Sequence, residues 1–217
     1  MNRSVIFKRI SSILDDIQRL NSELYAMNST DIQRYPVNYA VLCRDAALRS
    51  EAITCRMRHL IYASTSTKKS EYLVSAADIQ GVDIQQRGSI FEITLPSLLP
   101  ERKHWQSTEY LLDPLTAALR RYAESHPMPR FHYCTVCFSL IYAKNLPDRR
   151  IRDYDNLELK QYLDVAASFV MTDDTGLLCD TDCTTELGET DCTRIAIMDQ
   201  DRFPEWLKDR RSATDPP

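Results

Sequence analysis

The chain has 217 residues, of which 43% are hydrophobic and 27% charged, and its formal net charge is −4. This composition is that of a globular protein and excludes a disordered or collagen-like chain. The length allows one large domain or one domain with an appendage. The excess of acidic residues lies in 161–217, which argues against a general polyanion binder but leaves room for a local basic patch.

Cysteine usage and hydropathy indicate the compartment. Seven cysteines form an odd set, and the first residues show no secretion signal. Reduced thiols are therefore favoured over a disulfide framework. No stretch approaches the roughly 18 uninterrupted apolar residues of a membrane-spanning helix. We expect a cytoplasmic protein that does not enter a membrane.

The N-terminal third predicts a helical hairpin over residues 1–66. Apolar residues recur at steps of three and four from Ile6 to Leu24, which predicts a helix over about 4–26. The spacing is also that of a coiled coil, so the stripe is either a dimer seam or the face that packs on a second helix. That second helix is expected over about 37–62.

A run of Ser, Thr and Lys marks a linker over 67–85, and the remaining elements alternate in type. They predict an α+β fold: the helical hairpin, then a domain over 86–205 with a mixed β-sheet packed by helices, then a C-terminal tail over 206–217. The strands are expected at 89–95, 131–143 and 193–198, and the helices at 108–125 and 156–171.

The segment from Leu146 to Asp174 holds the candidate chemistry. Asp153 and Asp155 are one residue apart, so in an extended segment their side chains share a face. Asp174 follows the next predicted helix in a turn and could return toward them. A close cluster of carboxylates is suited to magnesium, which activates water in phosphodiester cleavage. The alternative is that these aspartates cap the helix and form turns in solvent.

The stretch RDYDNLELKQYLD followed by TDD resembles the hallmark of the RusA-like crossover-junction endodeoxyribonucleases. The resemblance implies that Asp153, Asp155 and Asp174 are catalytic, metal-binding aspartates for Mg²⁺ or Mn²⁺, and that Lys160 is a catalytic or DNA-contacting lysine. It implies a homodimer that cuts branched DNA such as Holliday junctions. One residue more than the usual pattern separates Asn156 from Lys160, and one residue turns a helix by about 100°.

The resemblance covers approximately 86–200, and the whole chain is also similar to an uncharacterised bacterial family of unknown function. Arg149, Arg150 and Arg152 precede the aspartates, where they could bind DNA phosphates or form an ordinary solvated loop. Cys134 and Cys137 have the spacing of zinc ligands, against the alternative of buried free thiols.

A second functional class stays open. The helical hairpin lies outside the resolvase pattern, and the C-terminal third is acidic. The chain could therefore be a non-catalytic, resolvase-like interaction or regulatory protein of a bacterial mobile element, with a protein partner bound through its N-terminal helices.

Overall fold

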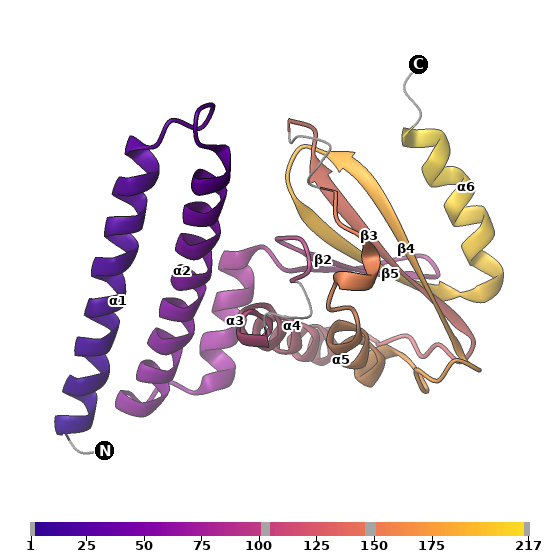
Figure 1. Cartoon of the computed structure of the whole chain (residues 1–217). Helices are drawn as coiled ribbons and strands as arrows, with labels where there is room; N and C mark the ends of the chain where they lie inside the picture. The colour runs from indigo at the N-terminus through magenta and orange to yellow at the C-terminus, as the bar shows by residue number, and fades with distance from the viewer. Residues whose placement is uncertain (1–2, 101–104, 146–150, 215–217) are drawn as a thin grey trace. The chain divides into compact units, whose positions relative to one another are not determined.

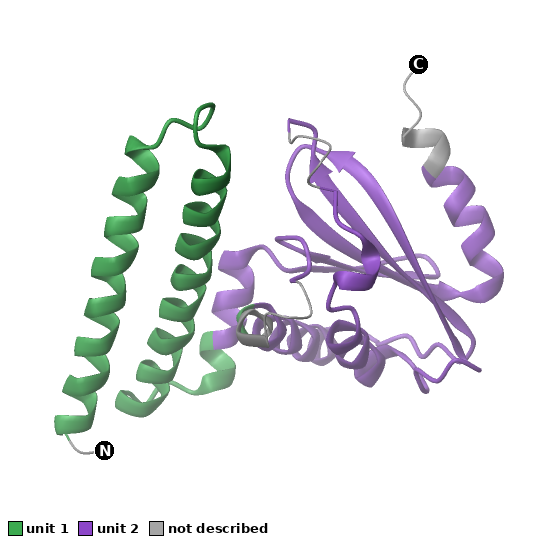
Figure 2. Cartoon of the chain, viewed as in Figure 1, with its two compact units in different colours: residues 1–72, 105–110 green, residues 73–104, 111–217 purple. Residues whose placement is uncertain are grey.

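The computed structural model describes residues 3–100, 105–145 and 151–214 (Figure 1). The chain divides into two compact units, residues 1–72 with 105–110, and residues 73–104 with 111–217 (Figure 2). Helix α3 (Lys69–Gln80) and helix α4 (Trp105–Ser125) each begin in the first unit and continue into the second. Of the described helices, none has the length and apolarity needed to cross a membrane.

The first unit is built on a hairpin of two long helices, α1 (Arg3–Ser29) and α2 (Pro36–Ser64). Proline at the start of α2 suits a helix N-terminus, where the missing N–H would have no intrahelical acceptor. Ile13 is buried between the helices. Arg49 of α2 forms a bidentate ion pair with Glu23 of α1, with the shortest N–O distance 2.7 Å. The predicted hairpin is confirmed.

The second unit contains a five-stranded sheet in the order β1-β2-β5-β3-β4. All neighbours are antiparallel except β3 and β4, which are parallel, so the predicted mixed sheet is confirmed. Gly88 adopts a φ of 62° in the tight turn between the first two strands, where glycine avoids the steric cost of a side chain. The strands are β1 (Asp83–Arg87), β2 (Ile90–Leu95), β3 (Cys134–Ala143), β4 (Cys179–Gly188) and β5 (Cys192–Asp199).

Strand β3 shows how the two faces of the sheet differ, because side chains alternate along a strand. Phe138 and its neighbours on one face are apolar and buried, and on that face Leu140 packs against Leu157. On the same face, Phe91 of β2 meets Tyr122 of α4 edge-on, with ring centroids 5.7 Å apart. The opposite face carries Ser139, which contacts the C-terminal helix α6 (Phe203–Thr214).

The structure differs from the sequence-based expectations at the ends and edges of elements. Helix α5 (Lys160–Val170) begins four residues later than expected, after a short 3-10 turn, η2 (Tyr154–Asn156). Strands β1 and β4 and helix α6 were not predicted, and helix α3 lies within the linker, which was expected to be a short helical or irregular stretch. Helix α6 occupies residues 203–214, most of the segment expected to be a tail.

Candidate functional site

Asp153 and Asp155 lie on either side of Tyr154 in the η2 turn, and both are exposed. The Tyr154 hydroxyl is 2.7 Å from Thr185 Oγ1 on β4, and this contact anchors the turn to the sheet. Asp153 occupies the N-cap position of η2 without a capping hydrogen bond from its side chain. Among the described residues neither carboxylate has a hydrogen bond or ion pair, so both remain open to a ligand.

Capping of helix α5 does not account for these aspartates, whereas their exposure at the η2 turn fits the other part of that alternative, turns in solvent. The N-cap of helix α5 is Leu159, which provides no side-chain cap. Asp155 and Asn156 lie one turn earlier, in η2. Neither aspartate supplies an oxygen to an orphan N–H of the α5 helix, which is the contribution that a capping role requires.

Arg152, next to the aspartates, is held by backbone and sheet contacts. Its backbone N–H donates to the Tyr142 hydroxyl at 3.0 Å, and its Nη1 donates to the Leu99 carbonyl at 3.1 Å. These bonds fix the chain entering the η2 turn. Arg149 and Arg150 lie outside the described residues.

Lys160 and Asp174, from opposite ends of the α5 segment, interact electrostatically. Lys160 Nζ lies 3.0 Å from Asp164 Oδ1. This hydrogen bond is the largest cause of a raised Lys160 pKa, and the charges of Asp174 and Glu158 raise it further. The lysine therefore remains a cation at neutral pH and shares its charge with two aspartates.

Asp174 lines a cleft of about 310 Å³ together with Arg130 and Asp164. Its neighbour Asp173 has a different role, because Asp173 Oδ1 accepts a hydrogen bond from the Thr175 N–H at 3.2 Å and closes the turn. Asp174 is half-buried.

Of the predicted site residues, the structure brings Asp153 and Asp155 together in the η2 turn. Lys160 begins helix α5, and Asp174 lies beyond the end of that helix. Within the described part of the chain, no three His, Cys, Asp or Glu side chains form a group that could hold a metal ion. The arrangement therefore does not fit a magnesium site made of the three predicted aspartates, and no catalytic step through a metal follows from this geometry.

All seven cysteines are free thiols; five lie on strands of the sheet, and Cys43 and Cys55 lie on helix α2. Cys134 of β3 and Cys179 of β4 are register partners, and both are buried. Burial raises the pKa of the Cys137 thiol, and it raises that of Cys183 to about 11. Cys134 and Cys137 are three residues apart on β3, so their side chains point to opposite faces of the sheet. The buried-thiol alternative therefore describes their surroundings better than a shared zinc site.

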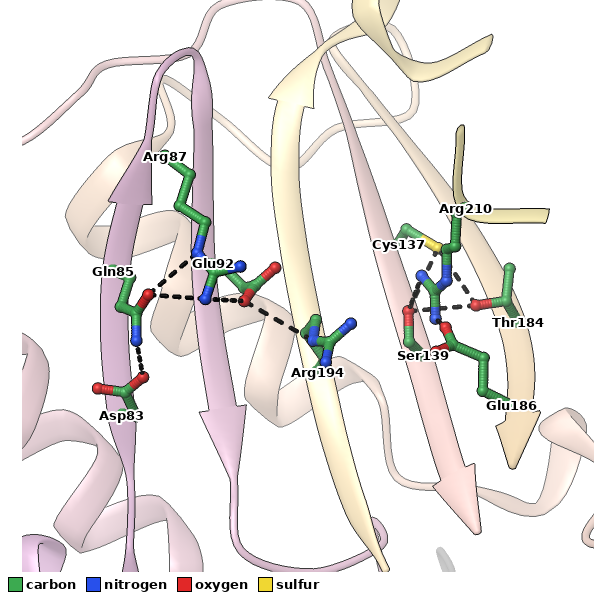
Figure 3. A network of polar contacts seen from close by, with 10 residues as sticks. All are labelled: Asp83, Gln85, Arg87, Glu92, Cys137, Ser139, Thr184, Glu186, Arg194 and Arg210. Carbon is green, nitrogen blue, oxygen red and sulfur yellow. Dashed lines mark hydrogen bonds and ion pairs between the residues drawn. The ribbon is translucent and has the colours of Figure 1, made fainter. Parts of the chain in front are cut away.

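The opposite face of the sheet carries a network of charged and polar side chains that sequence reasoning missed (Figure 3). Arg210 of α6 forms an ion pair with Glu186 of β4 and donates to Ser139 of β3. Towards β1, Glu92 lies between two guanidinium groups, 3.7 Å from Arg194 and 3.9 Å from Arg87. The Arg210 contacts attach α6 to the sheet through polar groups.

A second cleft, of about 740 Å³, was also missed. It lies where β3 begins and β5 ends, and it includes Arg130, His132, Tyr133, Asp199 and Arg202. The only signal in the sequence was the tetrad Arg130–Tyr133 (RFHY) with Pro129 before it, which reads equally well as the start of the strand.

The comparison with protein families matches residues 2–216 to a family of unknown function, DUF6100. Because the match spans nearly the whole chain, the protein belongs to this family. The comparison with curated proteins gives no match.

Proposed function

We propose that this protein is a cytoplasmic endodeoxyribonuclease that acts on branched DNA. The observation that carries the proposal is the RDYDN segment with Asp174 nineteen residues after Asp155, a pattern that resembles the RusA-like resolvases. Asp153 and Asp155 strengthen it because they are exposed in a turn that is anchored by its tyrosine.

The proposal takes the role of each residue from the resemblance. Asp153, Asp155 and Asp174 are the catalytic carboxylates, and Lys160 supplies positive charge to the phosphate that is attacked. Arg152 orders the chain before the aspartates through its bond to the Leu99 carbonyl. Dependence on Mg²⁺ or Mn²⁺ rests on the resemblance, because the described side chains do not form a metal-ligating group.

The test is cleavage of a synthetic four-way junction in magnesium, with linear duplex as the comparison substrate. The wild type should cut the junction, and Asp155→Asn should lose at least about a hundredfold in rate, the size expected when a catalytic electrostatic group is removed. Because Asp155 has no partner among the described residues, its substitution should leave the melting temperature unchanged.

Asp209→Asn is the matched control, since Asp209 is an exposed aspartate of α6 in the same unit. It should cut as fast as the wild type. An intact junction after incubation with the wild type, or an Asp155→Asn variant as fast as Asp209→Asn, would show that the nuclease proposal is wrong.

The second candidate is a non-catalytic interaction protein, and helix α1 favours it. Four apolar side chains of this helix are largely exposed: Phe7 at 54%, Leu14 at 53%, Ile17 at 44% and Leu24 at 49%. With Ile10 and Asn21 they follow the three- and four-residue steps of a heptad seam. An asparagine within such a seam is a device that fixes register and a two-stranded state.

We propose a second copy of this chain as the partner of α1. Helix α1 is 27 residues long. Its exposed apolar stripe would bury on the order of 500 Å² per copy in a dimer, and flanking polar atoms would add to this area. A standard interface buries roughly 800 Å² per partner. The seam would make the homodimer that both candidate functions use: two active sites for a symmetric junction, or a scaffold with two binding faces.

Analytical ultracentrifugation at about 20 μM tests the seam. The wild type should sediment as a dimer, and Leu14→Asp should sediment as a monomer because a buried unpaired charge is costly. Leu177→Asp is the control, since Leu177 is 87% exposed and far from α1 in sequence. A monomeric wild type, or a Leu14→Asp variant that still dimerises, would contradict the α1 interface.

A further inference from the structure

The second cleft is formed by two segments that the sheet holds together. Tyr133 directly precedes β3, and Gln200 begins the short turn η3 (Gln200–Arg202) after β5. The Gln200 N–H donates to the Tyr133 carbonyl at 3.3 Å. The end of β5 pairs with the start of β3, as Asp199 opposite Cys134 shows. The cleft is therefore part of the sheet framework.

An aromatic pair presents ring surface in this cleft. The Tyr133 side chain is 54% exposed, and its ring lies 4.5 Å from that of His132, tilted by 70°. An exposed ring on a backbone that the sheet holds is accessible to a stacking partner. Phe131, which precedes this pair, is buried. Its backbone N–H donates to the Val170 carbonyl at 2.8 Å, and its carbonyl accepts from the Thr172 N–H at 2.9 Å.

Arg130 connects the two clefts of this unit. It lines the aromatic cleft with Tyr133, and it lines the smaller cleft with Asp174. Its side chain is exposed and has no ion pair or hydrogen bond to any residue that the structure describes. A guanidinium in this state can bind a phosphate without first breaking another contact.

The aromatic cleft is not a simple polyanion groove. Arg130 and Arg202 contribute positive charge, but Asp199 and Asp201 balance it, and Arg202 is already paired with Glu205. A ligand bound mainly through phosphates would be repelled by the carboxylates. Base stacking adds affinity beside a phosphate contact, and the carboxylates can accept hydrogen bonds from base amino groups.

We infer that the aromatic cleft binds a single strand of DNA, with a base stacked on Tyr133 and the adjoining phosphate on Arg130. A strand bound in this way continues past Arg130, which also lines the cleft of Asp174. This path rests on the proposed function, since it delivers an unpaired strand to the candidate catalytic residues. A base within a duplex cannot stack on Tyr133, so the cleft selects unpaired arms or branch points.

Fluorescence anisotropy with a labelled twelve-nucleotide single strand, in EDTA so that no cleavage occurs, tests the inference on the full-length protein. Tyr133→Ala should raise the Kd about five- to a hundredfold, since stacking of one base is worth about 1–3 kcal/mol. Tyr133→Phe keeps the ring and should restore binding. Tyr35→Ala removes a tyrosine that is 46% exposed in the other unit and should bind like the wild type.

Arg130→Gln gives a second, independent readout. It should weaken binding and reduce the slope of log K against log salt by about one, the contribution of a single phosphate contact. Equal Kd values for Tyr133→Ala and Tyr35→Ala, or tighter binding of duplex than of single strand by the wild type, would overturn the inference. Tighter binding of a matched RNA strand would overturn the assignment to DNA.

The outcomes separate this inference from the nuclease proposal. Binding that depends on Tyr133 in a protein that leaves junctions uncut supports the strand site and contradicts the nuclease. Junction cleavage that depends on Asp155, with binding indifferent to Tyr133, supports the nuclease and contradicts the strand site.

Discussion

Different forces stabilise the interior of each of the two units. In the first unit, Ile13 is the buried residue of α1, and ion pairs such as Arg49 with Glu23 link the two helices. In the second unit, every position of β3 except Ala143 is buried. Apolar burial contributes roughly 25 cal/mol per Å², whereas exposed ion pairs contribute little. The sheet unit therefore has its own core, and the hairpin depends more on what covers its exposed stripe.

The largest expected effect comes from the sheet core. Phe138 is completely buried, so Phe138→Ala should lower the free energy of unfolding by about 3–5 kcal/mol through lost contacts and a residual cavity. Ile13→Ala, in the hairpin, should cost less because a two-helix interface can close around the gap. Urea denaturation followed by circular dichroism measures both, and equal costs would show that the hairpin has a core as well packed as the sheet.

The next effect comes from the buried ion pair under α6. The side chains of Arg210 and Glu186 are 11% and 16% exposed, and burial lowers the Arg210 pKa. Arg210→Met leaves the Glu186 carboxylate without its partner and should cost about 3 kcal/mol.

The double variant Arg210→Met with Glu186→Leu should recover much of that loss, because no unpaired charge then remains. Urea denaturation of the three variants tests this, with Trp206 of the same helix as a fluorescent probe. A double variant no more stable than Arg210→Met alone would show that the cost comes from lost packing of the helix.

The same contrast explains which elements could be predicted from the sequence. Strand β3 was predicted because it lies inside the sheet and is rich in aromatic and β-branched residues, and α1 because its stripe has helical spacing. The two missed strands, β1 and β4, are the edges of the sheet. An edge strand carries polar residues along one side, as DIQQR and CDTDCTTELG do, so the apolar alternation that identifies a strand is absent.

The candidate site could be predicted only in part, for a related reason. A motif gives the residue types and their spacing, so Asp153 and Asp155 could be identified before the turn that presents them was known. The distance in space between that turn and Asp174 depends on how helix α5 packs against the sheet. The spacing of residues along the sequence does not determine that packing. Arg130 and Tyr133 were missed because a cleft formed by β3 and β5 joins segments that are distant along the chain.

A smaller effect is expected for the ion pairs between the hairpin helices. Arg49 and Glu23 are 27% and 17% exposed, and Arg49→Gln should cost about 1 kcal/mol, less in 1 M salt because exposed charges are screened. Arg44→Gln is the matched control, since Arg44 pairs only with its exposed neighbour Asp45 among the described residues. Melting temperatures of both variants at low and high salt test the prediction. A salt-independent loss for Arg49→Gln would indicate packing by its aliphatic stem.

The smallest effect is a pH dependence within the hairpin. Glu51 of α2 is half-buried, and burial raises its pKa above the ordinary value of 4.5. The folded state therefore holds this proton more tightly than the unfolded state. The resulting stabilisation is fully present below the unfolded pKa, and it is lost as the pH rises through the folded pKa. Above that range the buried carboxylate destabilises the hairpin.

Glu51→Gln removes this titration and keeps the shape of the side chain. The variant should match the wild type at about pH 4 and exceed it at about pH 8, by less than about 1 kcal/mol because solvent screens a half-exposed group. Glu71→Gln, at an exposed position of α3, controls for the loss of one negative charge. Urea midpoints at the two pH values distinguish the variants. An equal gain in stability of Glu51→Gln at both pH values would mean that the shape of Glu51, and not its charge, weakens the hairpin. The difference in stability between the two units would then come from packing alone.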